Sequence, residues 1–130
     1  MVAPLSEFED MKNKTLVLGA SENPDRYSNK AILKLLSKGK EVVAIGKIKG
    51  AVNGVEIETQ QVPSDDIDTV TLYLNPLHQK PYYDYIVSLK PRRIIFNPGA
   101  ENEELERIAA KEGIDVLEAC TLVMLSTGQY

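Results

Sequence analysis

The sequence has few of the features on which several classes of protein depend. Of its 130 residues only Cys120 is a cysteine, so the chain cannot form an internal disulfide. No apolar run approaches the roughly 20 residues that a membrane-spanning helix needs. The opening residues include Glu7, Glu9 and Asp10 and lack the basic start and apolar core of a secretory signal. We therefore expect a cytoplasmic protein with no membrane partner.

Net positive charge is also missing. The formal net charge of −4 argues against a nucleic-acid partner, because such partners are usually bound by a basic face. The basic residues are nevertheless unevenly distributed: residues 12–50 hold nine Lys and Arg against three acids, and the rest of the chain holds six against sixteen. This local excess either solvates a helix face or provides a field that attracts a small polyanion.

The length and composition fit one domain. A chain of 130 residues, 43% of them hydrophobic, can bury one core and is too short for two ordinary domains. No low-complexity tract interrupts it. We expect a single domain over residues 1–130, in which residues 1–13 form an N-terminal extension.

Strand and helix patterns alternate along the chain. Short apolar runs that end in turn residues predict five main strands, at 15–19, 41–45, 69–74, 93–96 and 114–118. Apolar residues at helical spacing predict three helices, the first capped by Ser28, the second with Pro81 in its first turn and the third from about Asn102 to Glu112. A short extra strand is expected at VEIE, after an irregular stretch, and the run 120–125 is either a helix or a strand.

This alternation predicts a Rossmann-like three-layer α/β fold, with a five-stranded parallel sheet and helices on both faces. In such a sheet, ligands bind beyond the carboxyl ends of the strands, where the strand order reverses. The segments at those ends are GASENPDRYSN, GKIKG, NPLH, NPG and ACT. We expect the binding site among them.

The loop after the first strand has features of a phosphate-binding loop. Gly19 allows a close turn, Ser21 and Ser28 offer hydroxyls, and the helix that follows presents unpaired N–H groups to an anion. The loop has only one glycine, so the dinucleotide fingerprint G-x-G-x-x-G is absent. From the spacing alone, a structural turn and a ligand-binding loop are equally good interpretations of this segment.

The end of the second strand differs from that of NAD-binding proteins, which usually place an acidic residue there to hold the ribose. This chain has Ile45, Gly46 and Lys47. Lys47 and Lys49 suit an additional phosphate on the ribose, as in CoA or NADP. The alternative is two exposed lysines in a flexible loop.

Several of these segments together resemble a known family. The run LVLGASENPDRYSNKA, with VVAIGK, LYLNP, IIFNPGAENEEL and EACTLV, resembles the stand-alone bacterial CoA-binding domain proteins, relatives of the CoA-binding N-terminal domain of the succinyl-CoA synthetase α subunit. The resemblance covers about residues 14–130. Its most specific part matches the family's G-x-S-x-N-P-x-R-x-S loop with Gly19, Ser21, Asn23, Pro24, Arg26 and Ser28.

The resemblance implies that coenzyme A or an acyl-CoA is the cofactor, and it implies roles for individual residues. Gly19, Ala20 and Ser21 would contact the pantetheine and pyrophosphate region, and Lys47 or Lys49 would reach the phosphates. One departure concerns the second strand, because many stand-alone relatives have V-N-P where this chain has residues 45–47.

Later segments are implied to complete the site. Asn75 and Pro76 would border the adenine, and Phe96, Asn97 and Pro98 would line the pantetheine arm. Cys120 matches a cysteine near the end of the family's domain. The predicted cofactor-binding residues are Gly19, Ala20, Ser21, Asn23, Arg26, Ser28, Gly46, Lys47, Lys49, Asn75, Pro76, Phe96, Asn97, Pro98 and Cys120.

Signals of catalysis are weak. His78, the only histidine, has no catalytic counterpart in the family and is interpreted as a surface or capping side chain. Cys120 has no partner histidine, and no metal-ligand cluster is visible. The sequence favours a binding module that regulates or carries, without a named protein partner. The alternatives are an NAD(P)-dependent enzyme or redox sensor on the same scaffold, and a ligand-free interaction protein, which a first loop collapsed over the helix N-terminus would favour.

Overall fold

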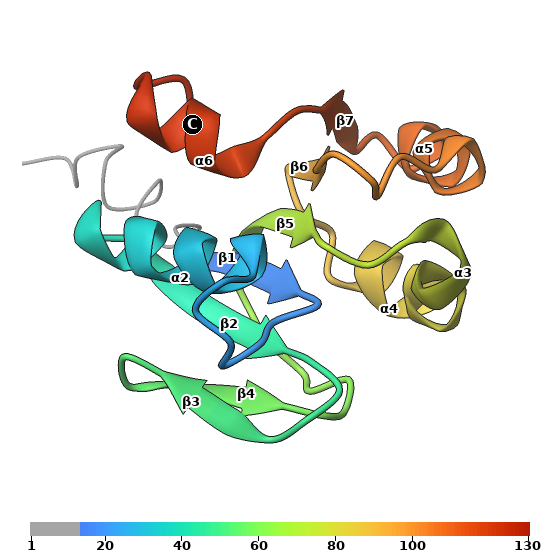
Figure 1. Ribbon diagram of the computed structural model, residues 1–130. Helices are drawn as coiled ribbons and strands as arrows, with labels where there is room; N and C mark the ends of the chain where they lie inside the picture. The colour runs from blue at the N-terminus through green and yellow to red at the C-terminus, as the bar shows by residue number, and fades with distance from the viewer. Residues whose placement is uncertain (1–13) are drawn as a thin grey trace, which may run out of the picture.

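The computed structural model describes residues 14–130, and the expected N-terminal extension over residues 1–13 lies outside them. The described residues form one twisted sheet with helices on both faces (Figure 1). Its order is β3-β4-β2-β1-β5-β6-β7. The strands are β1 (Lys14–Leu18), β2 (Glu41–Ile45), β3 (Gly50–Val52), β4 (Val55–Glu58), β5 (Ile67–Leu72), β6 (Arg93–Phe96) and β7 (Asp115–Glu118).

The five main strands exist and pair in parallel, but the prediction of a five-stranded parallel sheet is wrong. The sheet has seven strands and is mixed, because β4 pairs parallel to β2 and β3 pairs antiparallel to β4. The expected VEIE strand is β4, whereas β3 lies in the stretch that was predicted to be irregular. Asn53 and Gly54 join the two with positive φ angles of 47° and 87°. Asn-Gly between apolar residues is a strong hairpin signal, and it marks the strand that the sequence analysis missed.

The first helix, α2 (Tyr27–Ser37), follows the predicted pattern with one correction. Ala31, Ile32 and Leu35 are buried against the sheet, and Gly39 ends the segment with a φ of 75°. Ser28 is not its cap. Arg26 is the N-cap residue, and Ser28 is a buried residue of the first turn.

The chain after β5 departs further from expectation. β5 ends at Leu72, two residues early, and the single helix predicted around Pro81 is divided into α3 (Pro76–Gln79), a 3-10 turn (Lys80–Tyr82) and α4 (Tyr83–Ser88). The cause is a second start signal: Pro76 occupies the first turn of α3, and the Asn75 side chain accepts a hydrogen bond from the His78 amide.

The remaining helices agree with the patterns. The α5 helix (Glu103–Lys111) begins at Asn102, whose side chain accepts from the Leu105 amide at 3.2 Å. The C-terminal run, left open between helix and strand, forms α6 (Thr121–Ser126). No helix within residues 14–130 is long and apolar enough to cross a membrane.

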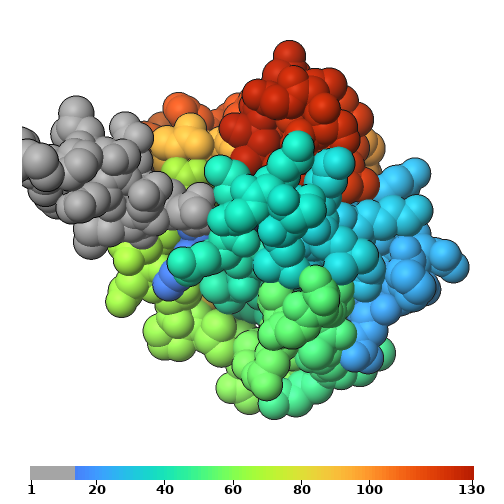
Figure 2. All heavy atoms as spheres, turned by 90° about the vertical axis from the view of Figure 1, so that its left-hand side faces the viewer, coloured from blue at the N-terminus to red at the C-terminus, as the bar shows by residue number. Residues whose placement is uncertain are grey.

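The helices cover the sheet in two layers. On one face α2 and α6 lie side by side, and Ile32, Leu35 and Leu125 pack on Val17 and Ala44 of the sheet. Figure 2 shows this face, with the C-terminal helix in red against α2 and the β3–β4 hairpin in green below. On the other face α4 and α5 cover an apolar cluster that includes Leu16, Val70, Ile86, Phe96 and Leu105. The expected layer of helices on each face is present.

Candidate functional site

A cavity of about 680 Å³ lies at the carboxyl ends of the central strands. The chain passes from β1 to β2 on one side and later returns to β5 on the other side of β1, so the strand order reverses beside β1. That is the position at which open α/β sheets bind ligands. The cavity wall holds nine of the predicted residues: Gly19, Ala20, Ser21, Asn23, Arg26, Ser28, Lys47, Asn75 and Pro98.

Gly19 lets the end of β1 fit tightly between its neighbouring strands. Its φ is 100°, and a Cβ atom there would lie 3.2 Å from the carbonyl carbon of Tyr73. The amides of Gly19 and Ala20 donate to the Ile45 carbonyl at 2.8 and 2.9 Å. These two N–H groups therefore hold the sheet together, and the contribution of Gly19 and Ala20 to the cavity is close backbone approach.

The loop between β1 and α2 is held open by its own hydrogen bonds. Ser21 Oγ accepts from the Asn23 amide at 3.1 Å, and Asn23 Oδ1 accepts from the Asp25 amide at 3.0 Å. The buried Asn29 side chain donates to the Ser21 carbonyl at 2.9 Å. The loop thus lines the cavity while it is tied to the first turn of α2 through Asn29.

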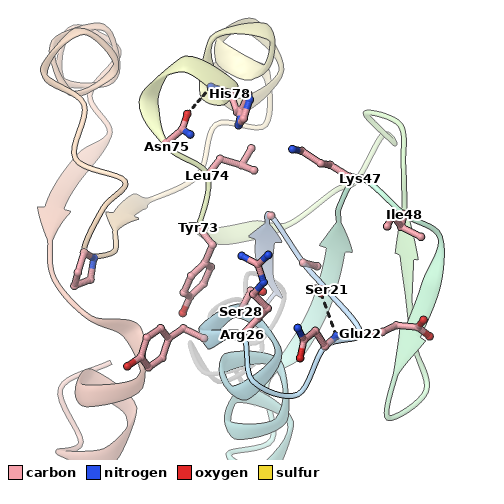
Figure 3. A pocket seen from close by; sticks show the side chains of 15 residues that line it. Ser21, Glu22, Arg26, Ser28, Lys47, Ile48, Tyr73, Leu74, Asn75 and His78 are labelled. Atoms are coloured by element: carbon pink, nitrogen blue, oxygen red, sulfur yellow. Dashed lines mark hydrogen bonds between the residues drawn. The ribbon is translucent and has the colours of Figure 1, made fainter.

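Positive charge enters the cavity from two elements. The N-terminus of α2 has no side-chain cap, and although the Asn29 amide donates to the Arg26 carbonyl at 3.1 Å, the helix dipole adds partial positive charge there. Arg26 stands at this helix start, and Lys47 follows β2 (Figure 3). The lysine and arginine are both exposed. This arrangement suits a ligand with negatively charged groups.

Glu22 is a wall residue that the sequence analysis missed. Its Oε2 accepts from the Ala51 amide at 2.8 Å, so the carboxylate ties the first loop to β3. The absence of an acid at the end of β2 therefore does not leave the cavity without a carboxylate. Because the contact depends on a strand that was not predicted, no sequence spacing indicated it.

Five other wall residues were not predicted: Tyr27, Ile48, Tyr73, Leu74 and His78. All lie within two positions of a predicted residue, and that closeness in the sequence was the available signal. Burial raises the pKa of Tyr73 to about 12, so its phenol stays protonated at neutral pH. His78 was interpreted as a surface or capping side chain. It is exposed, and the structure also places it on the cavity wall.

Six predicted residues lie outside the wall: Gly46, Lys49, Pro76, Phe96, Asn97 and Cys120. Gly46 lies beside the wall and is needed for close packing, because a Cβ atom there would lie 2.2 Å from the Ala20 carbonyl oxygen. Phe96 is fully buried in the core. Cys120 is the half-buried N-cap residue of α6.

Asn97 serves the fold directly. Its Nδ2 donates to Thr71 Oγ1 at 2.7 Å and to the Leu72 carbonyl at 2.9 Å, and its Oδ1 accepts from the Thr121 amide at 2.9 Å. Every polar atom of this buried side chain is used to join β5, β6 and α6. The family resemblance implied that Asn97 lines the pantetheine arm. In the structure its hydrogen-bonding groups are used within the protein.

The polar and charged groups of the cavity wall suit the binding of a ligand. Among residues 14–130 no group of three or more His, Cys, Asp and Glu side chains could hold a metal ion. The wall combines an uncapped helix start, two cationic side chains, one carboxylate and one imidazole. These groups can hold a ligand that carries both anionic and hydroxyl groups.

Comparison with known proteins points to one family. The sequence model of a family described as "CoA binding domain" matches residues 13–126. A crystal structure titled only "uncharacterized protein" is 49% identical, with a TM-score of 0.88, and covers 91% of this chain and 98% of its own. No protein with a curated description matches the sequence.

More distant structures share the fold. A hypothetical protein from Pyrococcus horikoshii OT3 is 20% identical with a TM-score of 0.81 and covers 97% of this chain and 92% of its own. A dinucleotide-forming acetyl-coenzyme A synthetase 1 from Ca. Korarchaeum cryptofilum, in complex with phosphate and ADP, is 22% identical with a TM-score of 0.67. The match covers 82% of this chain and 25% of the synthetase, so the same fold occurs there as one part of a larger protein.

Proposed function

The chain belongs to the CoA-binding domain family, and from that premise we propose that its cavity binds coenzyme A or an acyl-CoA. In this proposal residues 1–130 act as one cytoplasmic binding domain that regulates or carries and does not catalyse. We further propose that it is one of the stand-alone bacterial proteins, related to the N-terminal domain of the succinyl-CoA synthetase α subunit.

The observation that carries this proposal is the meeting of positive groups at the strand-order reversal. Arg26 and the start of α2 approach from one loop, and Lys47 approaches from the next. CoA carries a pyrophosphate and a 3′-phosphate, which are the groups that helix N-termini and cationic side chains bind best. We assign the pyrophosphate to the α2 side and the 3′-phosphate to Lys47.

The other wall residues have supporting roles in this proposal. Ser21, Asn23 and Ser28 supply hydroxyl and amide groups beside the pyrophosphate. Asn75 borders the adenine, and Pro98 contacts the pantetheine arm. Lys49, Pro76, Phe96, Asn97 and Cys120 lie off the wall and have no contact with CoA in this assignment.

One observation favours the second candidate, an NAD(P)-dependent enzyme or redox sensor on the same scaffold. Glu22 places a carboxylate on the cavity wall, and a carboxylate is the group with which NAD-binding proteins hold the ribose diol. Its Oε2 already accepts from the Ala51 amide. That contact lowers its capacity for a ribose and leaves CoA as the first candidate.

Thermal unfolding with CoA, acetyl-CoA, NAD, NADP and ATP separates the two candidates. A ligand that binds only the folded state raises the melting temperature. We expect CoA and acetyl-CoA to raise it and NAD to leave it almost unchanged. In calorimetry, Arg26→Ala should weaken CoA binding while leaving the melting temperature of the free protein close to wild type, because Arg26 is exposed. Stronger stabilisation by NAD than by CoA would overturn the proposal.

A further inference from the structure

The only histidine of the chain lies on the wall of the cavity. His78 belongs to α3, and its amide is held by Asn75 Oδ1 at 3.1 Å and also bonds to the Asn75 carbonyl at 3.1 Å. The next residue, Gln79, is fully buried and donates to the Leu74 and Ala100 carbonyls at 2.8 and 2.7 Å. The short helix is thus fixed on both sides of His78, and the position of the imidazole at the cavity follows from the fold.

The charged groups around the cavity are mostly cationic. Lys47 extends into the cavity from the side opposite α3, and Arg26 approaches from the start of α2 (Figure 3). Glu22 is the acidic residue on the wall, and its Oε2 is occupied by the Ala51 amide. A protonated His78 would therefore complete a set of three cations from three separate segments of the chain.

The charged groups on the outer side of α3 are already engaged. Lys80, which follows α3, lies 3.9 Å from Glu104 of α5. From the loop after β6, Glu101 accepts from the Gly99 amide at 2.8 Å. Both carboxylates have partners of their own, so neither is a dedicated counter-ion for the imidazole. An anion that entered the cavity would be a new partner for His78.

We propose that His78 contacts a phosphate group of bound CoA and that its contribution to the affinity for CoA grows as the pH falls. The inference rests on the proposed function, since it concerns the same cavity. Among the cationic residue types, histidine is the one whose charge ordinarily changes between about pH 8 and pH 5. His78 is thereby a binding residue, and it adds regulation by pH to a site whose other cations are permanent.

The expected effect is modest because the imidazole is exposed to solvent. A contact of this kind contributes on the order of 1 kcal/mol, which is about a fivefold change in affinity. The ligand also titrates: the 3′-phosphate of CoA takes up a proton near pH 6, and this weakens binding at low pH. The contribution of His78 is therefore measured as a ratio between variants, in which the titration of the ligand cancels.

The experiment is a calorimetric titration with CoA and with 3′-dephospho-CoA at about pH 5.5 and about pH 8. His78→Gln removes the charge, and His78→Lys makes it permanent over this range. Leu77→Gln is the matched control, because Leu77 is an exposed neighbour on the same helix outside the cavity wall. We expect the wild-type to His78→Gln affinity ratio to be about fivefold larger at the lower pH. The His78→Lys protein should bind about as tightly as wild type at the lower pH and more tightly than wild type at the higher pH.

The two ligands show which phosphate is involved. If the ratio changes for both, His78 contacts the pyrophosphate, and if it changes for CoA alone, His78 contacts the 3′-phosphate. Parallel pH profiles of wild type and His78→Gln with both ligands would overturn the inference while leaving CoA binding intact. Failure of the wild type to bind CoA at either pH would overturn the proposed function itself. Thermal unfolding of each variant confirms that the folded state is being compared.

Discussion

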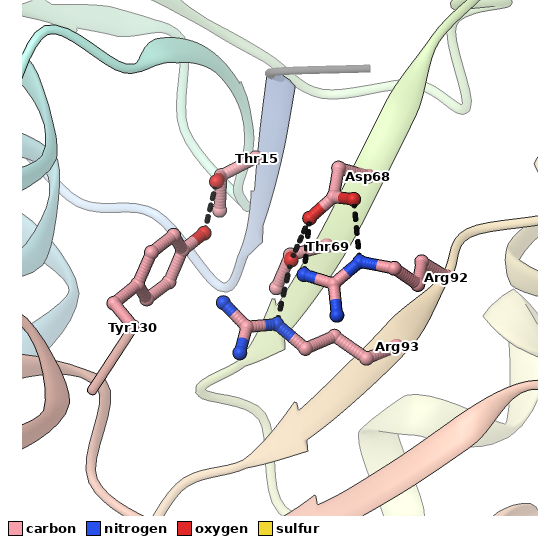
Figure 4. Close-up of polar contacts among 6 residues, drawn as sticks. All are labelled: Thr15, Asp68, Thr69, Arg92, Arg93 and Tyr130. Carbon is pink, nitrogen blue, oxygen red and sulfur yellow. Dashed lines mark hydrogen bonds and ion pairs between the residues drawn. The ribbon is translucent and has the colours of Figure 1, made fainter. Parts of the chain in front are cut away.

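The two ends of the sheet both carry arginine and other polar residues, but these residues differ in whether they bond to one another. At the amino ends of the strands, polar and charged side chains bond to one another, and Figure 4 shows six of them: Thr15, Asp68, Thr69, Arg92, Arg93 and Tyr130. At the carboxyl ends, Arg26 and Lys47 face the cavity, and within residues 14–130 neither forms an ion pair. At the amino ends Arg92 and Asp68 neutralise one another, whereas Arg26 and Lys47 at the carboxyl ends remain available to a ligand.

The amino-end cluster is a chain of donors and acceptors. Arg92 bonds to both carboxylate oxygens of Asp68, at 2.8 and 3.0 Å. Arg93 Nε donates to Thr69 Oγ1 at 2.9 Å, and Thr69 in turn donates to Asp68 at 2.7 Å. The Arg93 guanidinium lies 4.3 Å from the centre of the Tyr130 ring. One carboxylate thus serves two arginines, one directly and one through a hydroxyl.

The largest expected effect comes from Arg93. The residue is only 6% exposed, so Arg93→Ala removes buried packing on Tyr130 and the hydrogen bond to Thr69. We expect a loss of about 2–3 kcal/mol in the free energy of unfolding. Arg92→Ala is the matched control, since that side chain is 54% exposed and its ion pair should contribute about 1 kcal/mol or less. Urea unfolding measures both, and equal losses would show that burial does not distinguish the two arginines.

Gly46→Ala should disturb the carboxyl end instead. The added Cβ would lie 2.2 Å from the Ala20 carbonyl oxygen, so the first loop must shift. We expect a destabilisation of about 1–3 kcal/mol together with weaker CoA binding. Gly113→Ala, before β7 at the other end, strains a backbone with a φ of 77° but meets no atom within 4 Å. It should cost stability while leaving CoA binding of the folded protein unchanged, and calorimetry compares the two variants.

Lys47 and Lys49 allow a test of position at equal charge within one loop. They have the same charge and lie two residues apart, but only Lys47 is on the cavity wall. CoA should bind more tightly than its 3′-dephospho form, and Lys47→Ala should reduce that preference by about 1 kcal/mol, roughly fivefold. Lys49→Ala should have a smaller effect. Added salt should also shrink the preference, because it screens exposed charges. Titrations at low and high ionic strength decide this, and equal affinities of wild type for the two ligands would remove Lys47 from the phosphate site.

The smallest effect concerns pH at the amino end. Burial alone would raise the pKa of Asp68, but the hydrogen bonds from Arg92 and Thr69 and the nearby arginine charges hold it below its ordinary value. A lowered pKa in the folded state means that the ionised group stabilises the fold above about pH 4 and that this stability is lost as the pH falls further. The stability difference between wild type and Asp68→Asn, up to about 1 kcal/mol at neutral pH, should therefore shrink below about pH 4. A constant difference across that range would contradict this role.

Only some parts of the site could be predicted from the sequence. The first loop was predicted as a site because its glycine turn and helix start are local signals and because it resembles the G-x-S-x-N-P-x-R-x-S loop of a known family. Glu22 was missed because its partner, the Ala51 amide, is 29 positions away on an unpredicted strand. Phe96 and Asn97 were assigned to the ligand by resemblance, and neither lines the cavity, because both are buried between elements that only packing brings together.

The amino-acid sequence by itself determined the five main strands, the helices α2 and α5 and the face that each of these helices buries, because these follow from short-range apolar periodicity and turn residues. It also determined that basic groups would gather in residues 12–50. Only the tertiary structure decided which of those groups reach the cavity, that His78 joins them, and that Arg92 and Arg93 are engaged at the far end. Those outcomes depend on strand order, and strand order is set by long-range packing of the whole sheet, which no local pattern encodes.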